Sequence, residues 1–363
     1  MTKTKIFRWT RDPHICKYTQ NATQDVAWET TVRPHRHIAS VILMLAVGVA
    51  HAGSVTVYSA LESDEIATYL GAAKKALPDI DIHVLRLSSG DLAARLLAES
   101  QRPRNDVIWG MAVTDMLDPR IAALLAPVHG THIDSMPPGF RDRDGRWFAP
   151  TGFLAALCVN REALADQGLP MPRSWNDLAS PAYRGQIAMP DPSSSGTGYM
   201  LISSLSDAGR DPAGMALTLG IARNVGQVTL SGSAPCKLAR IGEFPIGISF
   251  AFSAMQAIRQ GYPVTMVIPE GVKGYELEAS ALMKQAAGNE DARRFLDWTA
   301  SPEAAALYRG YKEIVAAPGS VPSAEQQREG LPADLVATLP VRDFDTAARE
   351  RAALIARYKR LTR

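Results

Sequence analysis

The stretch Asp191-Pro-Ser-Ser-Ser-Gly-Thr-Gly198 lies between a short apolar run at residues 186–189 and a helical apolar pattern that continues to Leu205. This order predicts a buried strand, a turn and the start of a helix. The first amides of a helix have no intrahelical partner, and glycine lets a ligand approach the backbone closely. The stretch therefore favours an anion site for a phosphate, phosphonate or carboxylate. The alternative is that Ser195 or Thr197 only caps the helix.

The N-terminal segment has the pattern of a secretory signal peptide. A thirteen-residue apolar run, Ile38 to Ala50, follows Arg33 and Arg36 and ends in the A-x-A pattern at Ala52. A basic region, a short apolar region and such a cleavage site are typical of export, whereas a membrane span needs about 20 apolar residues. We therefore predict cleavage after Ala52 and, because no lipobox cysteine follows, a periplasmic protein. The alternative is a buried N-terminal helix.

Removing residues 1–52 changes the charge of the chain. These residues carry seven Lys and Arg against three Asp and Glu, so the net charge falls from +2 for the whole chain to about −2 for the rest. A slightly acidic protein lacks the basic surface that nucleic acid requires, and we expect no nucleic-acid partner. The remaining 311 residues are enough for two lobes with separate cores. Because the basic region is unusually long, we also expect translation to begin near Val32.

Strand and helix patterns alternate after the signal peptide. Strand patterns at 55–59, 80–87 and 106–109 are separated by helical patterns at 62–76 and after Ser88. This order predicts a parallel sheet with right-handed crossovers, and such sheets bind ligands at the carboxyl ends of their strands. Two loops fall at those ends, and their candidate ligand contacts are Ser59, Glu62, Ser88 and Ser89.

A second set of elements follows a connecting strand pattern at 147–159. It includes the stretch at residues 191–198 and the loop Ser231-Gly-Ser-Ala-Pro235. This loop also precedes a helical pattern, so Ser231 and Ser233 are further candidate anion contacts. The other predicted elements are strands at 245–252, 264–268 and 276–283 and helices at 253–260, 286–307 and 344–361. The strand at 276–283 is expected to return to the first set, so the chain crosses between the two α/β halves more than once.

Two cysteines, Cys158 and Cys236, remain after removal of the signal peptide. In an oxidising compartment this number predicts one disulfide, although two buried free thiols are the alternative. There is no C-x-x-C spacing, and the histidines of this part are His83, His129 and His132. We therefore expect no zinc site and no redox motif.

Catalytic motifs are missing from the sequence. It contains no G-x-x-x-x-G-K-[ST] loop, no H-E-x-x-H and no G-x-S-x-G, and no base for a nucleophilic Ser195 is identifiable. The carboxylates Glu62, Glu276 and Glu278 could act as acids or bases, or could bind an amine. Because the candidate site is rich in hydrogen-bond donors and poor in proton-transfer groups, we predict a binding protein rather than an enzyme, with no cofactor and no metal.

Eight motifs, in order along the chain from about residue 54 to 320, carry a resemblance to a known family. They are Val57-Tyr-Ser-Ala-Leu-Glu-Ser-Asp-Glu65, Val107-Ile-Trp-Gly110, Cys158-Val-Asn160, Ser174-Trp-Asn-Asp-Leu178, Tyr183-Arg-Gly-Gln-Ile187, Met189-Pro-Asp-Pro-Ser-Ser-Ser-Gly-Thr-Gly198, Ser231-Gly-Ser-Ala-Pro-Cys-Lys237 and Glu243-Phe-Pro-Ile-Gly-Ile-Ser-Phe250. Together they resemble the extracellular solute-binding proteins of 2-aminoethylphosphonate ABC importers. The Ser-Trp-x-Asp-Leu motif is also found in related ferric-iron binders.

The resemblance implies a type II periplasmic binding protein, in which two α/β lobes joined by hinge strands close on a ligand. We expect residues 53–154 and 272–312 to form the first lobe and residues 155–271 and 313–363 the second. The implied partner is an ABC permease in the inner membrane, the protein itself being a monomer, and relatives also carry both cysteines. The expected ligand contacts are Ser59, Glu62, Ser88, Ser89, Ser194, Ser195, Gly196, Thr197, Ser231, Ser233, Tyr275 and Glu276.

One departure from the family concerns ligand specificity. Similar sequences have an acidic-aromatic-basic triplet after Ile-Ser-Phe, whereas this chain has Ala251-Phe-Ser253. Loss of a carboxylate from the cleft would weaken recognition of the ligand ammonium, but loss from the surface would not. Phosphate esters, sulfonates and ferric iron therefore remain alternative ligands, and an exported hydrolase is a further alternative. Iron is disfavoured because iron-binding relatives use an adjacent tyrosine pair, and no Tyr-Tyr occurs here.

Overall fold

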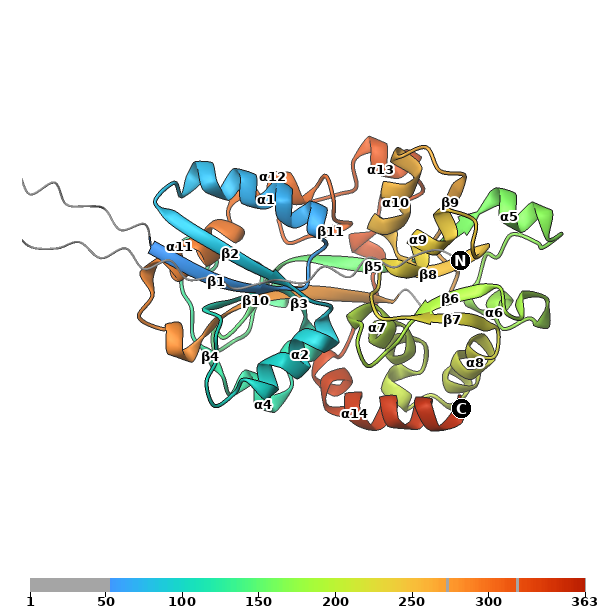
Figure 1. Ribbon diagram of the computed structural model, residues 1–363, viewed down its shortest axis with the longest axis horizontal. Coiled ribbons are helices and arrows are strands. Elements are labelled where there is room, and N and C mark those ends of the chain that lie inside the picture. Colours follow the sequence, from blue (N-terminus) through green and yellow to red (C-terminus); the bar gives the residue numbers. More distant parts are fainter. Residues whose placement is uncertain (1–52, 272–273, 318–319, 363) are drawn as a thin grey trace, which may run out of the picture. The chain divides into compact units, whose positions relative to one another are not determined.

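The computed structural model describes residues 53–271, 274–317 and 320–362, so the predicted signal peptide lies outside the described residues (Figure 1). Within them the strands are β1 Gly53–Ser59, β2 Ile80–Arg86, β3 Val107–Ala112, β4 Leu125–Ala126, β5 Phe148–Asn160, β6 Ile187–Pro190, β7 Val225–Thr229, β8 Ile246–Phe250, β9 Val264–Val267, β10 Tyr275–Met283 and β11 Ile314–Val315. The α-helices are α1 Ser63–Ala76, α2 Ser89–Ala98, α3 Val113–Met116, α4 Pro119–Ala122, α5 Arg161–Asp166, α6 Trp175–Leu178, α7 Gly196–Leu205, α8 Pro212–Ala222, α9 Ala234–Arg240, α10 Ala251–Arg259, α11 Glu290–Thr299, α12 Pro302–Tyr308, α13 Ala324–Arg328 and α14 Phe344–Leu361.

The first three strands form the predicted parallel sheet. Strand β1 pairs in parallel with β2, with Val57 opposite Val84, and with β3, with Val57 opposite Val107. Helix α1 connects β1 to β2 and buries Ile66 and Tyr69, which are three residues apart on its apolar face. The carboxyl ends of β1 and β2 therefore lie at the same edge of the sheet, next to the starts of α1 and α2.

Two antiparallel strands, β5 and β10, run through the middle of the structure (Figure 1). Strand β10 pairs with β3 on one side and with β5 on the other. All thirteen residues of β5 are buried; its first half, from Phe148 to Leu154, pairs with β10, and its second half, from Ala155, pairs with β8 and β9. Strand β5 thus belongs to the sheets of both halves of the molecule, which accounts for its length and for its lack of polar alternation.

The second half of the structure contains β6, β7 and β8, with β6 parallel to both of its neighbours. The predicted disulfide is confirmed: Cys158 of β5 is bonded to Cys236 of α9. The bond joins residues 78 positions apart and ties the connecting strand to the helix that follows the loop at 231–235.

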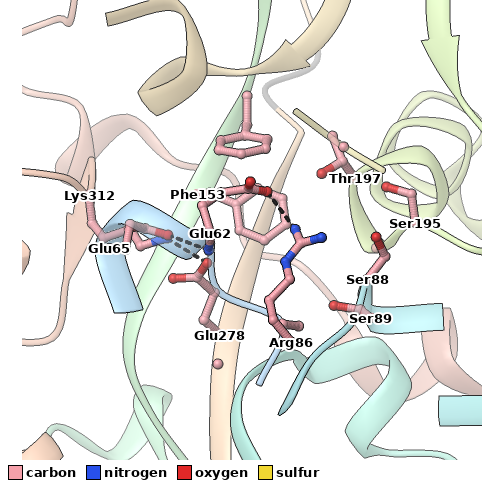
Figure 2. A pocket seen from close by; sticks show the side chains of 15 residues that line it. Glu62, Glu65, Arg86, Ser88, Ser89, Phe153, Ser195, Thr197, Glu278 and Lys312 are labelled. Atoms are coloured by element: carbon pink, nitrogen blue, oxygen red, sulfur yellow. Dashed lines mark hydrogen bonds and ion pairs between the residues drawn. The ribbon is translucent and has the colours of Figure 1, made fainter. Parts of the chain in front are cut away.

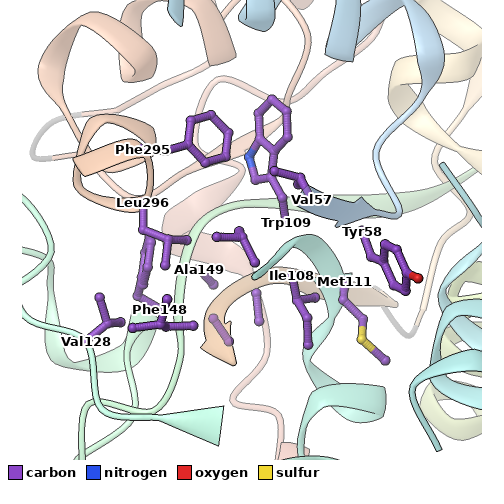
Figure 3. Packing of buried hydrophobic residues seen from close by; sticks show 14 of the residues in the cluster. Val57, Tyr58, Ile108, Trp109, Met111, Val128, Phe148, Ala149, Phe295 and Leu296 are labelled. Carbon is purple, nitrogen blue, oxygen red and sulfur yellow. The ribbon is translucent and has the colours of Figure 1, made fainter. Parts of the chain in front are cut away.

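Buried apolar side chains form two clusters. The first includes Trp109 of β3, whose ring meets the Phe295 ring of α11 edge-on at 5.3 Å (Figure 3). The second is built on the distal half of β5, on α7 and on α14. We propose that the two clusters are the cores of the two lobes, with the lobe boundaries expected from the sequence. Ile314 and Val315 are an exception, because those boundaries assign them to the second lobe whereas they pack in the first cluster.

Two predicted elements differ from the structure. The strand pattern at 245–252 ends at Phe250, and α10 begins at Ala251. The helical pattern at 286–307 is interrupted, because Ser301 accepts a hydrogen bond from the Ala304 amide as the N-cap of α12 and Pro302 has no amide with which to continue α11. Within the described residues, none of the helices has the length and apolar character required to cross a bilayer.

Candidate ligand-binding site

A polar pocket lies where the starts of α1 and α2 face the start of α7 (Figure 2). Its cavity volume is about 40 Å³, which is room for a few water molecules. The lining residues are Ala60, Glu62, Glu65, Arg86, Ser88, Ser89, Gly110, Phe153, Ser195, Gly196, Thr197, Gly232, Phe250, Glu278 and Lys312. Figure 2 shows the hydroxyl groups on one side and the group formed by Glu65, Glu278 and Lys312 on the other.

Four hydroxyl groups on one side of the pocket have a hydrogen free to donate. Ser88 and Thr197 make no side-chain hydrogen bond to any residue that the structure describes. The Ser89 hydroxyl accepts from the Ala112 amide at 3.2 Å and the Ser195 hydroxyl accepts from the Gly198 amide at 3.3 Å, so that both retain their own hydrogen. Free donors that converge in one place are suited to a ligand that only accepts hydrogen bonds, such as a phosphonate.

The stretch at residues 191–198 holds two of these hydroxyls, those of Ser195 and Thr197, in position. Strand β6 ends at Pro190, and the Asp191 carboxylate accepts from the Ser193 amide at 2.6 Å, which closes the turn. Ser195 is the N-cap of α7, a helix of ten residues whose first amides, those of Gly196 and Thr197, bond no described residue. Ser195 therefore caps the helix and also lines the pocket, so a role as helix cap and a role in an anion site are compatible.

The two halves of the molecule touch at Gly90. Its amide donates to the Ser194 carbonyl at 3.0 Å, and a Cβ at this position would lie 2.2 Å from the Ser193 carbonyl oxygen. Backbone atoms cannot move aside as a flexible side chain can, so any larger residue holds the starts of α2 and α7 apart.

We expect Gly90→Ala to weaken ligand binding by roughly tenfold, because closure loses this backbone contact. The substitution replaces a helical glycine by the best helix former, so the thermal midpoint should not fall. Calorimetric titration and small-angle scattering measure the affinity and the radius of gyration. Gly71→Ala in α1 is the matched control, since nothing lies within 4 Å of its Cβ position. Equal affinities of the two variants would contradict the prediction.

Arg86 and Glu62 form an ion pair within the pocket. The Arg86 Nη2 lies 2.8 Å from Glu62 Oε1, and Arg86 Nε donates to the Leu61 carbonyl at 3.1 Å. The other carboxylate oxygen, Oε2, accepts from the Ser233 hydroxyl at 3.0 Å, and Lys237 Nζ lies 4.0 Å from it. Glu62 stands before α1 and Ser233 before α9, so this carboxylate connects the two halves of the molecule.

A second charged group is buried at the floor of the pocket. Lys312 Nζ lies 2.7 Å from Glu65 Oε1 and 2.7 Å from Glu278 Oε1, and the Thr151 hydroxyl donates to Glu278 Oε2 at 2.6 Å. Burial raises the pKa of Glu65 to about 7 despite the nearby ammonium. Burial by itself lowers the pKa of Lys312, but Glu278 and Glu65 outweigh it and hold that pKa above its ordinary value.

Glu313, next to Lys312, is buried and accepts no hydrogen bond from any described residue. Burial raises its pKa to about 8, so the folded state binds a proton more tightly than the unfolded state. Ionisation of Glu313 therefore lowers the free energy of unfolding as pH rises from about 4.5 to about 8. Above pH 8 this effect of Glu313 on stability is nearly constant.

We expect Glu313→Gln to raise the free energy of unfolding at pH 8 by about 1 kcal/mol or more and to have less effect at pH 5, because the carboxyl is then already neutral. Denaturant unfolding at both pH values measures this difference. Glu162→Gln, at an exposed glutamate of α5, is the control. A gain at pH 5 as large as that at pH 8 would show that the charge of Glu313 has no role.

Six of the residues selected from the sequence line the pocket: Glu62, Ser88, Ser89, Ser195, Gly196 and Thr197. The side chains of the other six are not part of this lining. Ser59 donates to the Trp109 carbonyl, Ser194 donates to the Leu230 carbonyl, Ser233 donates to Glu62, the Ser231 carbonyl accepts from Thr229, Tyr275 packs on Phe344, and the buried Glu276 accepts from Thr114 at 2.7 Å. Ligand contact by these six stays a prediction for the ligand-bound protein.

Sequence reasoning did not select Arg86, Glu65 and Lys312. Arg86 ends β2 just before Ser88, a position at the carboxyl end of a strand that could have been a signal. Residues 251–253, where the acidic-aromatic-basic triplet is missing, are buried at the start of α10, directly after the lining residue Phe250. The loss of the acidic residue is therefore not a change on the surface.

Two α/β lobes that share antiparallel strands and enclose a polar pocket define the class of two-lobed solute-binding proteins. The chain belongs to the bacterial extracellular solute-binding protein family, whose model matches residues 120–345, more than half of its length. This membership confirms the prediction that the chain is not an enzyme and the predicted fold class.

Two relatives and one solved structure are similar to the chain over most of its length. A protein of Haemophilus influenzae without a described function is 29% identical over 62% of this chain and 66% of its own length, just under two thirds. The probable ABC transporter periplasmic-binding protein y4fP of Sinorhizobium fredii is 26% identical over 74% of this chain and 75% of its own. The solved periplasmic binding protein AfuA of Actinobacillus pleuropneumoniae, with exogenous fructose-6-phosphate bound, is 26% identical with a TM-score of 0.76, covering 84% of this chain and 97% of AfuA.

Proposed function

We propose that this chain is the periplasmic solute-binding component of an ABC importer and that it binds a small organophosphonate, 2-aminoethylphosphonate in particular. The observation that carries the proposal is the convergence of free donors at the starts of α2 and α7, beside the Arg86 guanidinium. The mechanism is capture between the lobes followed by presentation of the closed form to a membrane permease. The ligand stabilises that form by its differential affinity for the closed and open states.

The available donors are sufficient for useful affinity. A hydrogen bond to a charged group contributes roughly 1.5–3 kcal/mol, and micromolar affinity corresponds to about 8 kcal/mol. Three to five bonds from the hydroxyls of Ser88, Ser89, Ser195 and Thr197 and from the first amides of α7 reach this range. Phe153 and Phe250 supply aromatic rings to the pocket lining, against which a short carbon chain would pack.

A phosphate ester is the second candidate ligand. It is supported by AfuA, whose structure contains fructose-6-phosphate, since a phosphate ester presents the same three oxygens as a phosphonate. Both ligands exceed the cavity of about 40 Å³ and would have to widen it, and the smaller phosphonate would widen it less.

Calorimetric titration tests the proposal with 2-aminoethylphosphonate, phosphonoalanine, inorganic phosphate, fructose-6-phosphate and ferric citrate. We expect the tightest binding for 2-aminoethylphosphonate. Tighter binding of fructose-6-phosphate would replace the phosphonate by a phosphate ester as ligand. Binding of ferric citrate alone would overturn the anion site, and turnover of a phosphonate would make the protein an enzyme.

The other parts of the proposal concern location and assembly. We propose export through the signal peptide at residues 1–52, a monomeric protein and a separate permease as partner. The periplasmic location and the permease are supported by the similarity to y4fP, a probable ABC transporter periplasmic-binding protein. Cell fractionation and light scattering of the purified protein test the location and the oligomeric state.

A further inference from the structure

The Arg86–Glu62 ion pair lies at the centre of the pocket, between its two sides (Figure 2). The two side chains are 28% and 14% exposed, so both charges are largely removed from water. Arg86 uses Nε and Nη2 for protein contacts, whereas its Nη1 bonds no residue that the structure describes. An anion that accepts from Nη1 therefore shares the single charge of the guanidinium with Glu62 Oε1, so that the two negative groups compete for one cation.

The charges of the pocket favour a ligand that brings a cation of its own. Its lining has three carboxylates, Glu62, Glu65 and Glu278, against two cations, Arg86 and Lys312. Lys312 is shared between Glu65 and Glu278 at 2.7 Å each. Burial raises the pKa of Glu65 to about 7, so the charges of the lining at neutral pH sum to between zero and −1, and a simple dianion would add uncompensated negative charge where water is excluded.

A simple anion would also leave Glu62 without its partner. If the ligand takes Arg86 for itself, the carboxylate retains the Ser233 hydroxyl at 3.0 Å and the Lys237 ammonium at 4.0 Å, a side chain that is 54% exposed. A carboxylate that is 14% exposed and loses its close cation has a large desolvation cost.

We infer, building on the proposed function, that the ligand is a zwitterion that inserts into the Arg86–Glu62 pair. Its phosphonate replaces Glu62 as the partner of Arg86 and bonds the hydroxyls of Ser88 and Ser195. Its ammonium replaces Arg86 as the partner of Glu62, next to Ser233. Each buried charge keeps an opposite partner, and the ligand reaches both lobes because Glu62 and Ser233 belong to different ones. Glu62 is then the residue that selects an amino-phosphonate over a phosphonate without an amine.

The test compares 2-aminoethylphosphonate with ethylphosphonate by calorimetric titration of the full-length secreted protein. We expect the wild type to prefer the amine by at least about tenfold, the equivalent of one charge-assisted hydrogen bond. Glu62→Gln should bring the ratio of the two affinities close to one, mainly by weakening binding of the amine. Glu99→Gln is the matched control, since Glu99 pairs with Arg95 at 3.0 Å, is 17% exposed and lies outside the pocket lining; it should keep the wild-type ratio.

Three outcomes separate the inference from the proposed function. Binding of both phosphonates without preference by the wild type, or an unchanged preference in Glu62→Gln, overturns the exchange of partners and leaves a phosphonate-binding protein. Binding of neither phosphonate by the wild type overturns both proposals. Circular dichroism shows whether Glu62→Gln is folded. If it is not, Glu62→Asp still tests the inference, because it keeps the carboxylate and should retain a preference for the amine.

Discussion

Replacing Thr197 by valine together with Ser195 by alanine is expected to weaken phosphonate binding by roughly 10²- to 10⁴-fold. Each change removes a donor to a charged ligand, and such a bond contributes about 1.5–3 kcal/mol. The Thr197 side chain is buried and its hydroxyl bonds no described residue, so the protein loses little when the hydroxyl is replaced by a methyl group. Calorimetric titration with the ligand that binds the wild type most tightly measures the loss.

The control for this double variant is Ser204→Ala in the same helix. The Ser204 hydroxyl is buried, has no hydrogen-bond partner among the described residues and lies outside the pocket lining, so its loss should leave affinity unchanged. Ser195 also caps α7, and we expect its replacement to cost about 1 kcal/mol of stability. Thermal unfolding separates that cost from the loss of binding. An affinity within about threefold of the wild type would show that the stretch at 191–198 only caps the helix.

Local sequence signals were sufficient for the elements that surround the pocket. The strand before Asp191, the turn and the helix after Ser195 are each coded within a few residues, and β1 and β2 likewise end at the loops selected from the sequence. The length of β5 was also predictable, since thirteen consecutive residues carry no charge. The predicted helix boundaries were wrong where a capping residue determines them, as at Ser301, the N-cap of α12.

The charged part of the site has no local signal. Lys312 lies in a connection between α12 and β11, and its partners Glu65 and Glu278 come from a helix and a strand far away in the sequence. Glu276 and Glu278 are two residues apart on β10 and look equivalent in the sequence. The structure separates them, because Glu276 faces Thr114 of α3 whereas Glu278 lines the pocket beside Lys312. Only tertiary packing brings such residues together, so periodicity could not select between them.

Lys312→Met is expected to lower the free energy of unfolding at neutral pH by roughly 3–5 kcal/mol, since removing one partner of a buried ion pair leaves an uncompensated charge. Here two carboxylates, 0% and 6% exposed, would lose their shared ammonium. The variant should also disturb the pocket, because the Glu65 carboxylate that holds Lys312 accepts a hydrogen bond from the Glu62 amide at 2.9 Å. Denaturant unfolding at pH 8 and pH 5.5 measures the change in stability.

The pH dependence of this variant identifies the cause of the loss. Without the ammonium, the pKa of Glu65 rises further, because Lys312 no longer opposes the effect of burial. The folded state binds protons more tightly than the unfolded state, so the defect should shrink as pH falls from 8 to 5.5. The triple variant with Glu65→Gln and Glu278→Gln should recover most of the loss at pH 8, while Lys284→Met, at an exposed lysine, should show none. A defect of equal size at both pH values would mean that Lys312 stabilises the fold by packing, with its charge playing no part.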